Sequence, residues 1–118
     1  MILADTSVWI SHLHRPRRDL MDALMGGQAV MHPFVIGELA CGRIRRRQEQ
    51  IALLRAMPAI APASHDEVMV LIEERELHGR GLGWVDAHLL AAALLARARL
   101  LTDDRALQAT ARALGVAA

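Results

Sequence analysis

Four carboxylates stand where short apolar runs end or helical patterns begin, and they are the residues of this sequence best placed to do chemistry together. Asp5 and Asp104 each follow a short apolar run, as residues at the carboxyl end of a buried strand do. Asp86 falls in the first turn of an expected helix, and Glu38 lies on the apolar stripe of another. Ligands bind at the carboxyl ends of strands in parallel sheets. We therefore expect these four acids to meet at one edge.

Clustered acids of this kind require a cation. Two carboxylates about 4 Å apart repel by about 4 kcal/mol at an effective dielectric of 20. Ligands that are all oxygen select Mg²⁺ or Mn²⁺, and such an ion orients and deprotonates water and neutralises a phosphodiester in its transition state. Zinc is the alternative that six histidines leave open, although no histidine stands four residues from another.

Each acid also has a purely structural explanation, which the sequence leaves open. Asp5 is able to cap the helix that follows it, as are Thr6 and Ser7. Glu38 could snorkel at the edge of the apolar stripe or accept a hydrogen bond from the backbone. Asp86 is favoured by the dipole of its own helix, although Leu89 and Leu90 at i+3 and i+4 turn it inward.

The elements that would position these acids alternate along the chain. Buried strands are expected at 2–4, 28–32 and 100–102, with 59–61 and 116–117 as further short candidates. The helical patterns cover residues 6–14, 19–25, 33–41, 43–57, 64–77, 84–97 and 104–114. This order predicts an α/β fold, a three-layer sandwich with a mainly parallel central sheet of four or five strands.

Composition narrows the class of protein. The chain has 118 residues, 53% of them apolar, which predicts a single domain over residues 1–118. Cys41 is the only cysteine, so neither an internal disulfide nor a cysteine-rich zinc site is expected. The longest apolar run, 89–96, is too short to cross a bilayer. With no secretion signal at the N-terminus, a cytoplasmic protein without membrane contact is expected.

All of the basic residues are arginines, and their placement suggests a partner. The formal net charge is only +1, so bulk charge does not indicate nucleic acid. Four arginines nevertheless cluster in one stretch: Arg43, Arg45, Arg46 and Arg47. A solvated helix face is one explanation for this cluster, and a contact with RNA phosphates is the other.

Four stretches, taken in order, carry a family resemblance. They are Asp5-Thr6-Ser7-Val8-Trp9-Ile10, Glu38-Leu39, Gly83-Trp84-Val85-Asp86-Ala87-His88-Leu89-Leu90 and Leu101-Thr102-Asp103-Asp104-Arg105. Together they resemble the PIN-domain family, and most closely the VapC-type ribonuclease toxins of type II toxin–antitoxin systems. The resemblance covers essentially the whole chain.

The resemblance implies an endoribonuclease that uses Mg²⁺ or Mn²⁺, forms a homodimer and is held inactive by a cognate antitoxin. It assigns the acidic site to Asp5, Glu38, Asp86 and Asp104, with metal ligands among the three aspartates. It also implies a supporting hydroxyl, from Thr6 or Ser7 and from Thr102. Asp103 departs from the family pattern, in which this position is variable and often basic. The Thr-x-Asp spacing selects Asp104.

Rival classes differ from this sequence at identifiable points. Response-regulator receivers and haloacid-dehalogenase-type phosphatases also gather carboxylates at strand ends, but both need a lysine, and this chain has none. A non-catalytic PIN-like module that binds RNA or a protein partner is the alternative function. Retention of all four acids argues against that alternative, because an inactive site gains nothing from their repulsion.

Overall fold

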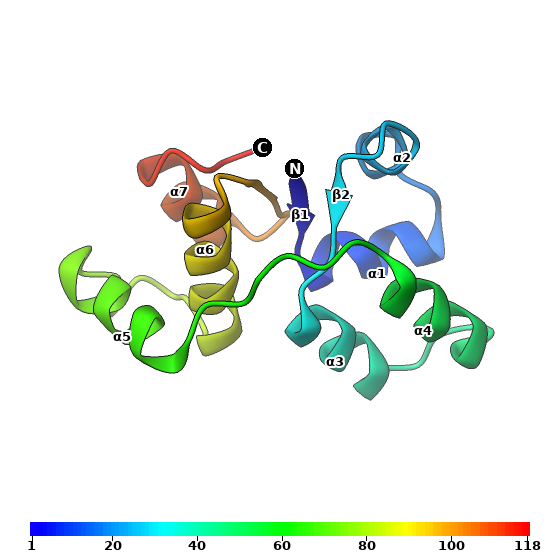
Figure 1. Ribbon diagram of the computed structural model, residues 1–118, viewed down its shortest axis with the longest axis horizontal. Coiled ribbons are helices and arrows are strands. Elements are labelled where there is room, and N and C mark those ends of the chain that lie inside the picture. The colour runs from blue at the N-terminus through cyan, green and yellow to red at the C-terminus, as the bar shows by residue number, and fades with distance from the viewer.

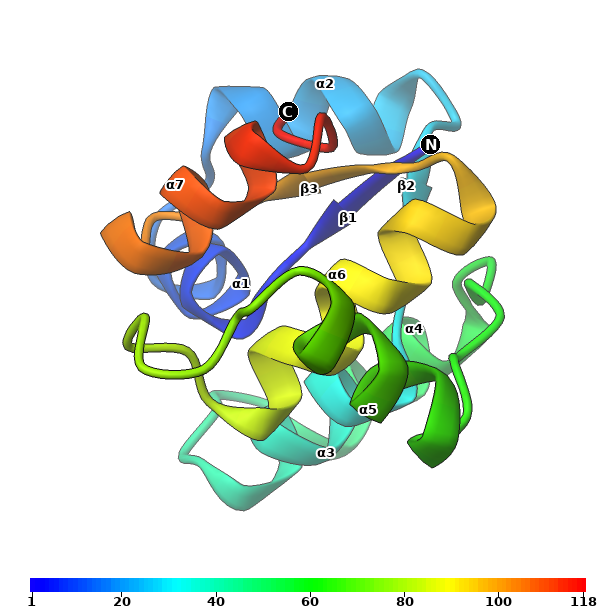
Figure 2. The same ribbon diagram turned by 90° about the vertical axis from the view of Figure 1, so that its left-hand side faces the viewer.

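The computed structural model describes residues 1–118 as an α/β fold in which seven helices surround a small parallel sheet. Helices α2 (Arg18–Met25) and α7 (Arg105–Ala113) lie on one side of the sheet. Helices α3 (Pro33–Cys41), α4 (Arg47–Ala56), α5 (His65–Glu74) and α6 (Trp84–Ala96) lie on the other (Figure 2). Helix α1 (Thr6–His14) follows directly from the central strand (Figure 1). The α/β class and the parallel sheet are as the sequence predicts.

The sheet has three strands in the order β2-β1-β3, with β1 at Ile2–Ala4, β2 at Ala29–Val30 and β3 at Arg99–Leu101. All pairings are parallel, with Leu3 opposite Val30 on one side and Leu100 on the other. Parallel strands end at the same edge, so β1 and β3 both deliver their following residues there. Asp5 and Thr102 are those residues.

The prediction of four or five strands is wrong. Segments 59–61 and 116–117 form only isolated parallel bridges, Met31 with Ala59 and Leu100 with Ala117. Pro58 and Pro62 flank the first of these segments, and a proline lacks the N–H that would extend a ladder. Both segments run beside the sheet edges without becoming strands.

Most helices begin and end within a residue or two of the expected positions, and α4 is the main exception. The arginine-rich stretch 43–46, expected to be helical, forms a turn, and α4 begins only at Arg47. Arg46 has φ 51°, in the left-handed region, which breaks a helix because a side chain clashes with the backbone there. Helix α5 ends at Glu74 rather than near Leu77, with Glu76 also left-handed.

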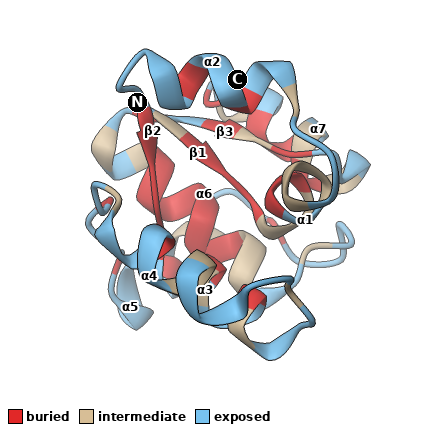
Figure 3. Ribbon diagram, turned by 90° about the vertical axis from the view of Figure 1, so that its right-hand side faces the viewer, coloured by how far each residue is buried: buried red, intermediate tan, exposed pale blue.

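The core lies on both faces of the sheet, against α6 on one side and against α2 and α7 on the other. Twenty-one buried residues form one continuous apolar cluster, which includes Leu3, Val8, Leu90 and Leu100. Buried residues concentrate on β1, β2 and the sheet-facing side of α6, while the outer faces of α2 and α4 are exposed (Figure 3). None of the seven helices combines the length and the hydropathy that crossing a bilayer requires. Burial of β1 on both faces fixes the position of Asp5 at its end.

Candidate metal-binding acidic site

Asp5 is both a helix cap and a buried acid at the sheet edge. Its carboxylate is 5% exposed and caps α1, with Oδ1 accepting from the Val8 N–H at 3.0 Å. Ser7 Oγ donates to the same oxygen at 2.6 Å, and the Thr102 hydroxyl donates to Oδ2. A carboxylate offers about four lone-pair sites. Three are therefore used to orient Asp5, and one on Oδ2 is left for a ligand.

Asp104 is fixed in a similar way at the end of β3. It caps α7, with Oδ1 accepting from the Leu107 N–H at 2.9 Å. Its own N–H donates to Thr102 Oγ1 at 3.0 Å, so Thr102 connects Asp104 with Asp5. Thr102 is buried and Asp104 is exposed. The second carboxylate oxygen of Asp104 accepts no hydrogen bond within the chain.

Asp103 is paired with an arginine that lies far from it in sequence. Arg17 forms ion pairs with both Asp103 and Asp19, and these two are the only salt bridges in the chain. These two ion pairs raise the pKa of Arg17, and Asp19 is the larger cause. Arg17 in turn lowers the pKa of Asp19. The sequence does not indicate a role for Arg17, because no local spacing signals a contact 86 residues away. The pairing leaves Asp104 as the unpaired acid of this turn.

Glu38 is exposed, and the expectation that it faces inward is wrong. In the sequence, Glu38 shares an apolar stripe with Phe34 at i−4 and Cys41 at i+3, but both of these residues are exposed. Glu38 instead points across to α1, where Thr6 Oγ1 donates to Oε1 at 2.5 Å. The hydroxyl of Thr6 thus aims one oxygen of Glu38 and leaves the other free.

Asp86 occupies the first turn of α6 and is half-buried. The Gly83 N–H donates to its Oδ2 at 3.0 Å and holds the carboxylate over the helix N-terminus. Burial is the largest cause that raises the pKa of Asp86, and the hydrogen bond from Gly83 opposes it. The negative charges of Asp104, Asp5 and Glu38 raise this pKa further.

The four predicted acids are therefore electrostatic neighbours, drawn from four segments of the chain. No arginine is among the groups that shift Asp86, although the chain contains 14 of them. No three His, Cys, Asp or Glu side chains lie in metal-ligating geometry as they stand. The donor set nevertheless fits a hard cation: it consists of carboxylate oxygens, and Glu38, Asp86 and Asp104 each keep one oxygen free. A bound ion would draw these oxygens closer together.

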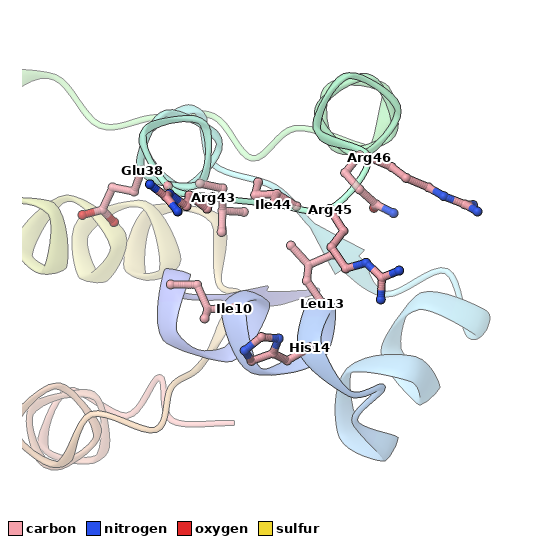
Figure 4. Close-up of a pocket in the computed structure, with 11 residues that line it drawn as sticks. Ile10, Leu13, His14, Glu38, Arg43, Ile44, Arg45 and Arg46 are labelled. Carbon is pink, nitrogen blue, oxygen red and sulfur yellow. The ribbon is translucent and has the colours of Figure 1, made fainter.

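The arginine cluster borders a cavity that begins at Glu38. The cavity has a volume of about 610 Å³ and lies between α1, α3 and the turn at 43–46. Figure 4 shows Glu38 at one end and Arg45 and Arg46 at the other, with Ile10 and Leu13 of α1 between them. Arg47 differs from the other three, because its Nη2 donates to the Ala40 carbonyl at 3.0 Å and so caps the end of α3.

A group of rings that sequence analysis did not single out lies beside the acids. His88 is 5% exposed, as expected of a packed histidine, and it contacts both Phe34 and Trp84 at ring-centroid distances of 4.6 Å. His32 is fully buried behind Phe34, and its Nδ1 accepts from the Phe34 N–H at 2.9 Å. Burial lowers the pKa of His32 to about 4, and His88 adds to this effect. Neither His32 Nε2 nor His88 Nδ1 has a hydrogen-bond partner.

Comparison with known proteins agrees with this architecture. The family model described as "PIN domain" matches residues 2–113. Ribonuclease VapC32 of Mycobacterium tuberculosis strain CDC 1551 is 47% identical over 118 residues, covering 99% of this chain and 95% of that protein. The protein of the same name in strain H37Rv matches equally. A family match over nearly the whole chain, together with a relative of this identity, shows that the chain belongs to the PIN-domain family.

Proposed function

We propose that this chain is a single-domain, metal-dependent endoribonuclease toxin that cleaves RNA phosphodiester bonds. The observation that carries the proposal is Asp86, whose pKa is raised by burial and by three other carboxylates with no cation against them. A folded protein tolerates such repulsion between carboxylates when a bound cation offsets their charge. The similarity to a protein named Ribonuclease VapC32 supports RNA as the substrate.

Asp5, Asp86 and Asp104 would hold the ion, with Glu38 beside them. When bound, Mg²⁺ or Mn²⁺ supplies a water of lowered pKa and neutralises charge on the phosphodiester. The chain's own part is orientation: Ser7 and Thr102 donate to Asp5, and Thr6 donates to Glu38. These hydroxyls hold the carboxylates in place without adding charge. Hydrogen bonds from neighbouring groups of the chain therefore set the orientation of these carboxylates and of their free oxygens.

RNA cleavage with added metal tests this function directly. Purified protein incubated with total RNA and Mn²⁺ should produce new 5′ ends at defined positions, and EDTA should abolish them. Asp86→Asn should abolish cleavage, whereas Asp22→Asn, an exposed acid on α2, should leave it unchanged. A protein that binds RNA but generates no new ends with either metal would support the alternative, a non-catalytic PIN-like module.

The cavity beside Glu38 supports the proposed antitoxin partner. Its lining combines the apolar side chains of Ile10, Leu13 and Ile44 with arginines, so an amphipathic segment with acidic side chains would complement it. A segment lying there would reach Glu38. Ile44→Ala, which changes no charge, should keep RNA cleavage but weaken inhibition by extract of the producing cells, while Leu53→Ala on α4 should remain inhibited. Inhibition that is equal in both variants would place the partner elsewhere.

A homodimer completes the proposal. It rests on the family resemblance, to which the structure adds exposed apolar side chains such as Met25. Light scattering at micromolar concentration should give twice the 13.0 kDa chain mass. A monomer at that concentration would remove dimerisation from the proposal and leave the nuclease site untouched.

A further inference from the structure

Two of the three Phe and Trp residues in this chain are exposed, one on either side of His88. There is no tyrosine, and the third aromatic residue, Trp9, is in the core at 4% exposure. Phe34 and Trp84 are 39% and 40% exposed, each with its ring against His88. Exposed apolar groups that gather at one place usually mark a binding surface. The chain thus places almost all of its exposed aromatic area at one spot.

The rings are held rather than loose. His88 lies tilted by 59° against Phe34 and nearly perpendicular, at 84°, to Trp84. On its other side Trp84 contacts His65, with ring centroids 5.0 Å apart. Phe34 in turn rests on the buried ring of His32 at 5.1 Å. A ring fixed in this way loses little side-chain entropy when a ligand covers it.

The pair of rings adjoins the acidic site on two helices. Phe34 and Glu38 are four residues apart on α3, which puts them on one face with a rise of about 6 Å between them. Trp84 and Asp86 share the first turn of α6.

We propose that Phe34 and Trp84, with His88 between them, form a platform on which an unpaired base of the RNA substrate stacks next to the scissile phosphate. Aromatic side chains bind bases of single-stranded RNA by stacking, and every base offers a π-face. A base held here would set which phosphodiester reaches the carboxylates. The inference rests on the proposed nuclease function, because the acidic site defines where the phosphate lies.

Binding of single-stranded RNA oligonucleotides to full-length protein tests the platform, with Asp104→Asn as the background so that the RNA stays intact. Trp84→Leu keeps an apolar side chain but removes the π-face, and Trp84→Phe keeps both. We expect Trp84→Leu and Phe34→Leu each to raise Kd about tenfold, and Trp84→Phe to raise it less than threefold. Leu95→Ala, an exposed residue at the far end of α6, should have no effect.

Fluorescence and abasic RNA give two further readouts. Because Trp9 is buried, RNA should quench mainly Trp84, and Trp84→Phe should remove that quenching. Wild type should bind an oligonucleotide with one abasic position beside the cleavage site about tenfold more weakly than the intact oligonucleotide. Trp84→Leu should bind the two oligonucleotides equally well.

Three results would overturn the platform. If wild type cleaves RNA with Mn²⁺ and the leucine variants bind and cleave equally well, the nuclease stands and the platform is wrong. If those variants change only the oligomeric state, the rings are a protein interface. If wild type neither binds nor cleaves RNA, the nuclease proposal itself has failed, and the platform fails with it.

Discussion

At the scale of single residues, Asp5 combines two roles that its sequence position presents as alternatives. As a cap it accepts the Val8 N–H, and as a member of the acidic site it accepts the hydroxyl of Thr102 from across the sheet. The cap fixes the carboxylate, since an N-cap side chain has little freedom once it is bonded to the backbone. A capping residue at the end of a central strand is thus already oriented for a ligand.

Asp103 and Asp104 form a natural matched pair for testing the site. Asp104→Asn should abolish RNA cleavage but change the free energy of unfolding by less than about 1 kcal/mol, because Asn caps a helix nearly as well as Asp. Asp103→Asn should keep cleavage and lose at most about 1 kcal/mol, the usual value of an exposed ion pair with an arginine. Cleavage assays and urea unfolding measure both effects.

The opposite pattern would reassign the site. If Asp103→Asn is inactive and Asp104→Asn is active, the Arg17 ion pair must open to release Asp103 toward the metal. Arg17→Gln would then raise activity, whereas the structure predicts that it leaves activity unchanged.

His32 should make the protein less stable in mild acid. Its pKa is about 4 in the folded chain and near 6.5 when unfolded. Between pH 4 and pH 6.5, His32 binds a proton in the unfolded chain but not in the folded one. The stability that neutral His32 contributes is therefore complete above pH 6.5 and is lost as pH falls to 4. The total loss is on the order of 3 kcal/mol. His32→Asn keeps the cap of α3, removes the titration, and should flatten the fall of Tm over this range.

Leu54→Ala serves as the control for this prediction. It lowers stability by removing core apolar area on α4 and should shift Tm equally at every pH. If His32→Asn shows the same slope of Tm against pH as wild type, another group accounts for acid unfolding.

At the scale of elements, the turn between α3 and α4 carries the arginines that the sequence places in a helix. A turn presents Arg43, Arg45 and Arg46 around a cavity that ends at Glu38, whereas a helix would have spread them over several faces. Setting aside the four site acids leaves nine acidic residues against 14 arginines, so the remaining surface is positive. With a cation at the acids, as proposed, that surface would attract RNA.

Charge reversal in this turn should weaken RNA binding in a salt-dependent way. Each phosphate contact in single-stranded RNA contributes about 0.7 to the slope of log K against log salt. Arg45→Glu with Arg46→Glu should therefore lower affinity and flatten the slope by about 1.4. Anisotropy titrations across a salt series measure this change. The double variant Arg97→Glu with Arg112→Glu, at exposed positions just after α6 and on α7, should alter the slope less. Equal changes in the two double variants would mean that RNA binding depends only on the net charge of the protein.

At the scale of the whole molecule, metal binding and pH should be coupled. The raised pKa of Asp86 means that the metal-free folded protein binds a proton more readily than the unfolded chain, so Asp86 favours the fold as pH drops. Metal binding requires the carboxylate deprotonated. The increase in Tm caused by Mn²⁺ should therefore be largest near neutral pH and shrink in acid. Melting curves with Mn²⁺ and with EDTA at several pH values measure it.

Asp86→Asn is the reference for this coupling. It should raise Tm in EDTA at neutral pH, because one of four repelling charges is removed, and should reduce the Mn²⁺ shift at every pH. A Mn²⁺ shift in wild type that does not vary with pH would contradict a carboxylate metal site.

Local sequence was sufficient for most of the helices and for the central strand, and it puts forward the four acids as candidates for a site. The long apolar helix at 84–96 rests on contacts within a few residues. The apolar run at 2–4 is visible in the sequence as a pattern, although its strand pairs with distant segments. The helix cap formed by Asp104 and its bond to Thr102 are also local. The predicted number of strands is wrong because the segments at 59–61 and 116–117 make only one bridge each. The extent of such pairing depends on the segments that the fold places beside them.

Only tertiary structure decided how these pieces meet. Glu38 lies outside the core because α3 packs with Phe34 exposed, and Asp103 is occupied because Arg17 reaches it from the start of α2. Phe34 and Trp84 are 50 positions apart in the sequence and belong to α3 and α6, with His88 between their rings. The physical reason is the range of the interactions: caps and amphipathic periodicity act over one or two turns, whereas ion pairs, ring contacts and burial depend on which distant segments the packing of the core brings together.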